Sequence, residues 1–455
     1  MADKEIFIDF GSTNTRVLYR DSIGTVTPLS LSGIPEVPSA FFRDSNGLPY
    51  IGRYPRFPSD ICISRVKQRF FFDRVGQSKS ELDRNGADLE EYFRLLRQLI
   101  SQSLLPLDHN DAEISLALPE SFITATSTCQ DFLARLAVAG FSKVHLFSEQ
   151  HAAVRFAMSR LASSDLAHVA ASKPIGVIVD IGNSTTDIAI IRFERKTSNA
   201  YALLQEGSIV TAGEHVTRDI LLSVVQQHCN RRRLTAPQQA AISRTYFSEH
   251  THLVQLFDGQ KVGISNDILA GKSTIAAGRL QLSFRDESLG ERDAAVTLGC
   301  SDDWTVEALL DAINHQGFVD PIIDQVDVLL ARDGLRKADV GLVVLTGGGS
   351  RWSPVLTSFQ ECFGPSGGLI LPDPKSKEAA YLRFEPQRAV VEGLVEIRST
   401  DGALPIASFE CRVDVKRNET LVGSFFKSRC HFESTGQSFA DELEFERCRR
   451  QTGAI

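Results

Sequence analysis

The sequence predicts a mixed α/β fold with an internal duplication, and three segments support this prediction. Two of them share one pattern, IFIDFGSTNTRVLY from Ile6 and VIVDIGNSTTDIAII from Val177. In each, apolar and β-branched residues flank a short polar turn, which is typical of two strands joined by a tight turn. The third segment, LVVLTGGGSR from Leu342, is an apolar strand that runs into three glycines before a helix predicted from Pro354.

The two polar turns favour phosphate binding. An aspartate precedes the glycine in both, as Asp9 before Gly11 and Asp180 before Gly182. A glycine at a strand end lets a ligand approach the backbone, and successive N–H groups can cup an anion. The carboxylates can hold a hydrated magnesium ion that bridges to phosphates. The hydroxyl donors are Ser12, Thr13, Ser184 and Thr185. Two such turns facing each other would clamp a polyphosphate.

The order of the three segments resembles that of the actin-like ATPase superfamily, and within it the seventy-kilodalton heat-shock chaperones. IFIDFGSTNTRV is similar to the family's first phosphate loop, VIVDIGNSTTDIAI to its second, and LTGGGSRWSP to its adenosine loop. The other similar segments, in the family's order, are IPEVPSAFF, SRVKQRF, ISLALPESF, LFSEQHAAVRFA, TAGEHVTRDILL and FEPQRAVVEGLVE. The resemblance covers about residues 4 to 398.

The resemblance implies a two-lobed actin-like fold, a duplicated ribonuclease-H-like architecture with a deep nucleotide cleft. Lobe I would span residues 1–172, with an outer part at about 34–111. Lobe II would span 173–380, with an outer part at about 212–299, and 381–398 would be a helix that returns to lobe I. Residues 399–455 alternate apolar and polar side chains, which predicts a short C-terminal β-rich segment of two or three strands.

The resemblance also implies ATP or ADP and magnesium as cofactors, and it assigns roles to particular residues. Lys67 and Glu149 would place the attacking water, Thr185 and Ser12 would contact the terminal phosphate, and magnesium would sit through waters near Asp9 and Asp180. Without the resemblance, Lys67 would be interpreted as a solvated surface group, as a single lysine usually is. Glu149 would be interpreted as a complement to the helix dipole, as a glutamate in a first turn usually is. The catalytic candidates are Lys67, Glu149, Asp180 and Thr185. The nucleotide-binding candidates are Gly11, Ser12, Thr13, Asn14, Gly182, Asn183, Ser184, Gly213, Glu214, Lys272, Gly347, Gly348, Gly349 and Arg351.

The chain departs from the family pattern at several positions. Asn183 and Ser184 stand where the family has glycines in its second loop, and Gly349 stands where it has serine. Gln150 replaces a proline, and Gln387 replaces an aspartate near the nucleotide. Beyond Val395, no segment resembles the family's linker, and KRNETLVGS and ELEFER resemble a fragment of its β-sandwich only faintly. The two or three strands predicted there are too few for a full β-sandwich and helical lid, so peptide clamping by the usual device is not expected.

Composition narrows the class of protein. The chain has 455 residues, of which 42% are hydrophobic and 23% charged, as in ordinary globular proteins of more than one domain. A net charge of −8 argues against nonspecific nucleic-acid binding. We expect no membrane span, because no apolar run reaches the length of one. The charged N-terminus and eight scattered cysteines without a C-x-x-C pair favour a cytoplasmic location.

Helical spacing and end signals predict the main helices. Helical character dominates residues 64–100, and a helix is expected over 126–138 with Gly140 after its end. Ser148 should cap the next helix, because serine at that position accepts a bond from the first turn. Further helices are predicted over 215–228 and from Asp320 to Gly334. AGKST at 270–274 is not a P-loop, because Asn266 stands where the motif needs glycine.

The sequence supports one leading function and leaves others open. The leading one is an ATP-binding, slowly ATP-hydrolysing chaperone-like protein in which ATP drives lobe closure. A second is a nucleotide-gated scaffold with little hydrolysis, which recruits a protein partner through residues 399–455. A third is a filament-forming actin relative, since fold does not determine function. A small-molecule kinase is least favoured, because no aspartate that would activate an acceptor can be assigned.

Overall fold

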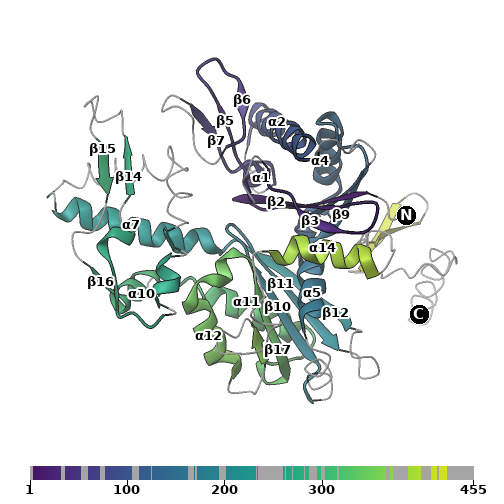
Figure 1. Ribbon diagram of the computed structural model, residues 1–455. Coiled ribbons are helices and arrows are strands. Elements are labelled where there is room, and N and C mark those ends of the chain that lie inside the picture. The colour runs from purple at the N-terminus through teal and green to yellow at the C-terminus, as the bar shows by residue number, and fades with distance from the viewer. Residues whose placement is uncertain are drawn as a thin grey trace. The chain divides into compact units, whose positions relative to one another are not determined.

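The computed structural model describes most of the chain up to residue 400 and a hairpin beyond it. The described residues are 4–31, 36–52, 60–71, 77–104, 112–123, 125–161, 169, 172–193, 201–231, 233, 260–261, 263–268, 270–280, 282–285, 295–298, 303–314, 317–364, 369–371, 388–400, 411–417 and 420–427. Their contacts divide the chain into two units, Met1–Ala403 and Leu404–Ile455. The first unit is mixed α/β, with several sheets and with helices packed against them (Figure 1).

The first large sheet contains the hairpin that begins at Ile6. Its strands are β1 Glu5–Phe10, β2 Asn14–Arg20, β3 Val26–Pro28, β4 Val37–Pro38, β8 Glu113–Leu118 and β9 Val144–Ser148. The strand order is β3-β2-β1-β8-β9, and β4 also pairs with β2. β2 is antiparallel to β1 and β3, whereas β8 is parallel to β1 and β9. The hairpin predicted from Ile6 is confirmed.

The second large sheet repeats this arrangement. Its strands are β10 Ile175–Ile181, β11 Thr186–Phe193, β12 Tyr201–Ile209, β17 Val340–Thr346 and β18 Leu369–Leu371. The order is β12-β11-β10-β17-β18, with β11 antiparallel to β10 and β12, and β17 parallel to β10 and β18. The two sheets therefore share strand order and strand directions, so the duplication seen in the two hairpins extends to whole sheets.

Helices α2 and α4 cover one face of the first sheet. The helices after β7 in this part of the chain are α1 Val66–Phe71, α2 Lys79–Ser103, α3 Glu120–Ile123 and α4 Thr126–Val138. Ile6, Ile8 and Phe10 of β1 pack against Tyr92 and Phe93 of α2 in one buried cluster. Such burial is the main source of stability in a core of this kind, at about 25 cal/mol per Å² of apolar surface.

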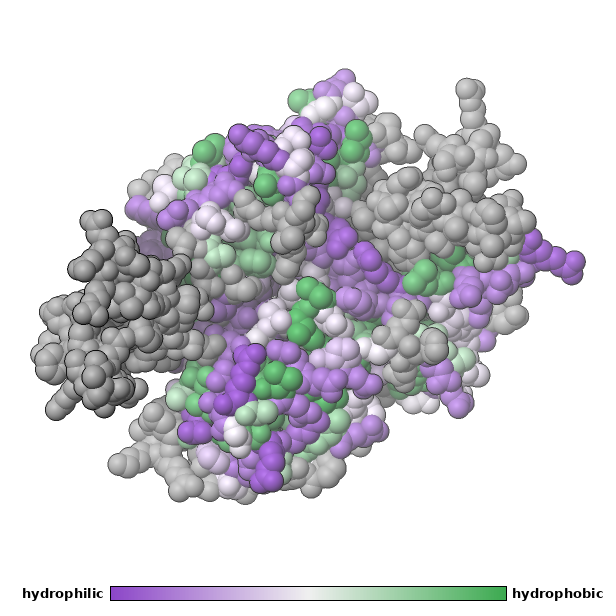
Figure 2. Space-filling model, turned by 180° about the vertical axis from the view of Figure 1, so that it is seen from behind, coloured by the Kyte–Doolittle hydropathy of each residue, from purple (hydrophilic) through white to green (hydrophobic). Residues whose placement is uncertain are grey.

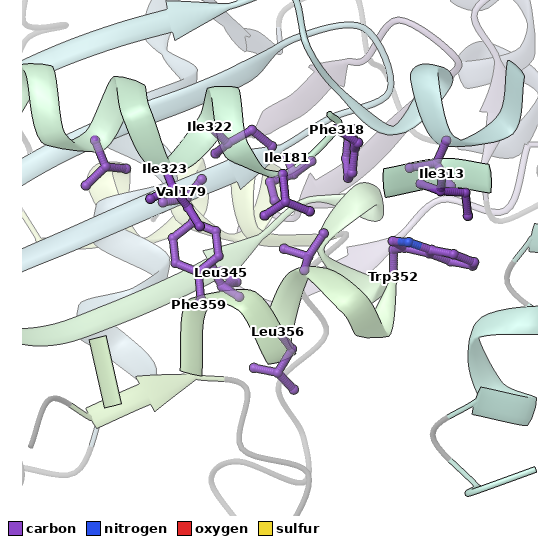
Figure 3. Packing of buried hydrophobic residues seen from close by; sticks show 14 of the residues in the cluster. Val179, Ile181, Ile313, Phe318, Ile322, Ile323, Leu345, Trp352, Leu356 and Phe359 are labelled. Atoms are coloured by element: carbon purple, nitrogen blue, oxygen red, sulfur yellow. The ribbon is translucent and has the colours of Figure 1, made fainter. Parts of the chain in front are cut away.

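Helices α11 and α12 cover one face of the second sheet. They span Asp320–Arg332 and Ser353–Phe363. Figure 3 shows Val179 of β10 and Leu345 of β17 packed with Ile322 of α11 and Phe359 of α12. The near-continuous apolar runs of β10 and β17 follow from this burial, because parallel strands are covered on both faces.

Two helices of this unit each pack on the large sheet that the preceding strand of the chain does not belong to. α5, Glu149–Arg160, follows β9 in the chain but packs through Val154 on Ile178 of the second sheet. α14, Ala389–Thr400, follows β18 but packs through Leu394 on Phe7 of the first sheet. The two helices lie side by side (Figure 1). They therefore link the two sheets in both directions.

Smaller elements complete the described part of this unit. β5 Phe41–Arg43, β6 Pro49–Tyr50 and β7 Ile61–Ile63 form a three-stranded sheet. Two two-stranded sheets pair β13 Thr274–Ile275 with β16 Trp304–Thr305, and β14 Leu282–Arg285 with β15 Ala295–Leu298. The remaining helices are α7 Gly213–Arg231, α10 Val306–Asn314, and the 3-10 helices η2 Ala277–Leu280, η4 Lys337–Asp339 and η5 Gly348–Arg351.

The predicted helix signals are confirmed where they are described. Ser148 accepts a bond from the backbone N–H of His151 at the start of α5. Gly140 and Gly334, which follow α4 and α11, have φ of 95° and 68°, in the left-handed region that glycine tolerates. The helical region predicted at 64–100 is divided into α1 and α2, and Ser78 forms a capping box with Glu81 at the start of α2.

The second unit contains an antiparallel hairpin of β19, Cys411–Arg417, and β20, Thr420–Lys427. These two strands agree with the β-rich segment predicted for residues 399–455, of which residues 428–455 lie outside the described part of the chain.

On the face shown in Figure 2, the described surface is largely hydrophilic. In Figure 2, hydrophobic residues form small separate groups among hydrophilic ones. None of the helices in the described ranges is long and apolar enough to cross a membrane.

Candidate functional site

One pocket in the first unit brings the three turns of the sequence together. It has a volume of about 120 Å³. Its walls come from the β1–β2 turn, the β10–β11 turn, the turn after β17, and single residues of α1, α5 and α14. The lining residues are Asp9, Gly11, Ser12, Thr13, Asn14, Arg16, Lys67, Glu149, Asp180, Gly182, Asn183, Thr185, Asp187, Gly347, Gly348 and Val390. Sequence positions more than 300 residues apart therefore share one cavity.

The third turn is held against the second hairpin because β17 lies beside β10. Asp180 is in register with Thr346, the last residue of β17. Gly347 follows with φ of 80°, and a Cβ at this position would lie 2.3 Å from Oδ1 of Asp180. Only glycine combines this backbone conformation with so close an approach. The glycine-rich sequence after LVVLT thus places backbone, rather than side chains, next to the Asp180 carboxyl.

Backbone donors are free at both polar turns. Within the described part of the chain, the N–H groups of Ser12, Thr13 and Asn183 have no hydrogen-bond partner. All three residues line the pocket. Unpaired N–H groups in successive turn residues are suitable donors for an anionic ligand.

A buried ion pair lies at the side of the pocket. Nζ of Lys67, in α1, is 2.6 Å from Oε1 of Glu149, the first residue of α5. Lys67 is 2% exposed and Glu149 6% exposed. Because each charge would be costly to bury alone, the pair holds the two side chains in a defined position. The structure thus joins two candidates that the sequence placed 82 residues apart.

A chain of hydrogen bonds positions Asp187 in the second hairpin. Nε2 of Gln150 donates to Oδ1 of Asp187 at 2.8 Å, and Oγ1 of Thr185 donates to Oδ2 at 3.2 Å. Oγ of Ser148 in turn donates to Oε1 of Gln150 at 2.9 Å. Gln150, which departs from the resembled family, therefore connects α5 to the second hairpin.

Arg16 occupies the corresponding position in the first hairpin. Its Nη1 lies 3.5 Å from Oδ2 of Asp9, and its Nε lies 3.0 Å from Oε1 of Glu36. Asp9 and Arg16 are directly opposite in the β1–β2 pairing. The Asp9 carboxyl, a predicted magnesium neighbour, is therefore next to a guanidinium.

Burial shifts the acidic groups of the pocket. It raises the pKa of Asp180 to about 7, and the nearby charges of Asp187 and Asp9 add to the rise. Burial also raises the pKa of Glu149, although Lys67 opposes the shift. The pKa values of Asp9 and Asp187 are raised for the same main reason. All four carboxyl groups are thus less readily ionised than in water.

The charge balance of the pocket fits a hydrated cation. Among the described residues, four carboxyl groups line it, but only two cationic side chains do, those of Arg16 and Lys67. A divalent cation would favour the ionised carboxylates, and magnesium commonly reaches protein carboxylates through its waters. Asp180 and Asp187 have no cationic side chain within ion-pair distance among the described residues. Within those residues, no group of three or more His, Cys, Asp or Glu side chains is arranged to hold a metal directly.

Six predicted site residues do not line this pocket. Ser184 and Glu214 line a neighbouring cavity of about 240 Å³, where both accept hydrogen bonds from Gln68. The N–H of Gly213 donates to the carbonyl of Gly182 at 3.0 Å, which places Gly213 behind the second turn.

The other three lie further along the second half of the unit. Lys272 pairs with Asp267 at 2.7 Å, and its side chain is 56% exposed. Gly349 is buried against Ile181, and a Cβ there would lie 2.5 Å from its Cγ2. Arg351 is exposed. Gln387 is outside the described residues.

Sequence reasoning missed Arg16 and Asp187 as site residues. The sequence nevertheless contained a signal for both residues, because the segment from Asp9 to Arg16 aligns without gaps with the segment from Asp180 to Asp187. Arg16 and Asp187 occupy the same position in that alignment, and both line the pocket.

Comparison with known proteins adds no assignment to this site. We found no protein-family model that matches the chain and no curated protein that matches it.

Proposed function

We propose that this protein binds ATP with magnesium in the pocket between the turns and slowly hydrolyses it to ADP and phosphate. One observation carries the proposal. Both duplicated turns and the glycine turn line the same cavity as the buried Lys67–Glu149 pair. A pocket with free backbone donors, two cations and an excess of carboxyl groups suits a polyphosphate accompanied by a metal ion.

We propose further that the first unit is a two-lobed, actin-like ATPase fold. The repeated strand order of the two large sheets and the exchange of α5 and α14 between them support this. The resemblance of the three turn segments to the heat-shock chaperones points to the same fold. In this arrangement each half would contribute one phosphate-binding turn.

The phosphates would lie against the turn residues, and the nucleoside would lie beyond them. A volume of about 120 Å³ suits phosphate groups better than a whole nucleotide, since pockets for drug-sized ligands are several times larger. A Cβ at Gly348 would meet nothing within 4 Å, so the backbone there borders open space. The adenosine would extend past Gly348 toward Gly349 and Arg351.

The buried lysine and the carboxylates would have separate tasks. Lys67, held by Glu149, would face the terminal phosphate and, with Glu149, orient the attacking water. Asp180 would contact the waters of magnesium, which when bound neutralises phosphate charge. Because this chemistry consists mainly of positioning, slow turnover is expected.

At the level of the whole protein, ATP would act as a switch. Closure around the phosphates would change how the two halves of the first unit meet, as in a chaperone-like protein of the cytoplasm. A protein client or partner would bind through residues 399–455.

Single-turnover hydrolysis of γ-labelled ATP, with excess protein and magnesium, tests the proposal. Lys67→Ala should reduce the rate by about 100-fold or more, because it removes a preorganised charge, while leaving ATP binding nearly intact. Lys272→Ala is the matched control, since that lysine was also a candidate but pairs with Asp267 outside the pocket. It should leave the rate unchanged.

A second variant guards against misfolding. Removing Lys67 alone leaves Glu149 buried without its partner, which commonly costs 3–5 kcal/mol, so the pair Lys67→Met with Glu149→Gln is tested beside it. Tight ATP binding without cleavage by the parent protein would favour the nucleotide-gated scaffold. No binding of ATP at all would overturn the proposal.

A further inference from the structure

The two hairpins of the pocket share a fold but differ in charge. In the first, Asp9 is opposite Arg16, and in the second, Asp180 is opposite Asp187. A cation thus stands in one hairpin where an acid stands in its duplicate. Because the two hairpins have the same strand directions and turn length, the difference lies in the side chains and not in the backbone.

Arg16 is held in place with donors to spare. Glu36 accepts from its Nε at 3.0 Å, and Asp9 lies 3.5 Å from Nη1. Two of the five guanidinium N–H groups are thereby engaged, and no further partner is found among the described residues. The side chain is 17% exposed and lines the pocket. A planar guanidinium anchored on one side and free on the other is suited to bind phosphate.

The second hairpin has the opposite character. Asp187 is bound by the neutral donors of Gln150 and Thr185, and neither Asp187 nor Asp180 pairs with a cation in the described part of the chain. The cations of the pocket instead pair with Asp9 and Glu149. The pocket carboxyl groups without a cationic partner in the described part of the chain, Asp180 and Asp187, therefore both belong to the second hairpin.

We propose that Arg16 is a phosphate-binding residue that serves as a built-in cation at the first hairpin, while magnesium is held from the side of Asp180 and Asp187. This inference rests on the proposed function. It moves the expected magnesium contact away from Asp9. Since part of the phosphate charge is met by Arg16, the protein should bind polyphosphates measurably without any divalent metal.

Calorimetric titration with ATP and with inorganic tripolyphosphate, each in EDTA and in excess magnesium, tests this. Arg16→Gln should weaken metal-free binding of both ligands by roughly 10- to 100-fold, the effect of losing a hydrogen bond to a charged group. An equal loss for the two ligands places the contact on phosphate and not on the nucleoside. Arg16→Lys keeps the positive charge but lacks the paired N–H donors of the planar guanidinium. Its metal-free affinities should therefore lie between those of the parent protein and Arg16→Gln.

Arg20→Gln is the matched control. Arg20 lies on the same strand and pairs with Glu5, its cross-strand neighbour, at 3.4 Å, but it does not line the pocket. It should leave both affinities unchanged. Asp187→Asn should abolish the gain in affinity that magnesium provides. Thermal melting of every variant establishes that it is folded.

The outcomes separate this inference from the proposed function. Metal-free affinity that is the same in Arg16→Gln and the parent would overturn the inference, as would binding by the parent only when magnesium is present. In both cases the ATP site itself would stand. A folded parent protein that binds neither ligand under either condition would overturn the proposed function and this inference with it.

Discussion

Burial determines how single charged residues behave in this protein. Lys67 and Glu149 are both buried and stabilise each other as a pair. Asp219 of α7, by contrast, is a buried acid without such a partner in the described part of the chain. It is 6% exposed, and among the described residues its carboxyl has no hydrogen-bond or ion-pair partner. Burial accordingly raises the pKa of Asp219 to about 6.

This shift predicts a pH-dependent stability. The native state binds the Asp219 proton more tightly than the unfolded chain, whose pKa is near 3.8. Its contribution to stability is therefore fully present below that value and is lost as the pH rises through about 6. Asn imitates the protonated acid, so Asp219→Asn should raise the melting temperature at pH 8 and leave it almost unchanged near pH 4. An equal change at both values would attribute the effect to side-chain shape and not to charge.

At the scale of elements, the contact between α5 and α14 links the two sheets. Gly393 of α14 lies directly on the backbone of Ala152 in α5, and a Cβ there would be 1.8 Å from the Ala152 carbonyl oxygen. No rotamer change can relieve a collision with backbone. The helices must therefore separate to accept any side chain at this position.

Gly393→Ala should consequently destabilise the first unit by about 1–3 kcal/mol or more, as overpacking does. Gly364→Ala is the matched control. Gly364 has ordinary helical φ and ψ of −58° and −42°, and a Cβ there would meet nothing within 4 Å. That change should be neutral or stabilise by about 0.4–1 kcal/mol. Denaturant unfolding measures both, and equal stabilities of the two variants would contradict the close contact.

At the scale of the whole molecule, the chain divides at Ala403. All the described residues that line the pocket precede this point, and the last of them is Val390. The proposed ATP site and the C-terminal hairpin therefore belong to different units. A partner bound to the second unit would sense the nucleotide only through coupling between the units.

A chain that ends at Ala403 should therefore bind ATP as tightly as the full chain and show the same main thermal transition. Calorimetric titration and scanning calorimetry of the two proteins measure this. A tenfold or greater loss of affinity, which corresponds to about 1.4 kcal/mol or more of binding free energy, would mean that residues 404–455 contribute to the site.

The sequence by itself determined the local elements and the repeated hairpin. Strand runs, the Ser148 cap and the glycines after α4 and α11 could be predicted, because they depend on neighbours within a few residues. The order of motifs made Lys67 and Glu149 candidates for the site, but it did not predict that their side chains are in direct contact.

Only the tertiary structure decided which side chains meet. The order of strands in the sheets brings Asp180 beside Gly347, and the exchange of α5 and α14 brings Gln150 to Asp187. Arg16 became a candidate site residue because β-pairing sets it opposite Asp9, and its side chain lines the pocket. Such contacts join positions far apart in the chain, so their partners depend on the packing of whole elements and not on the local pattern that forms each one.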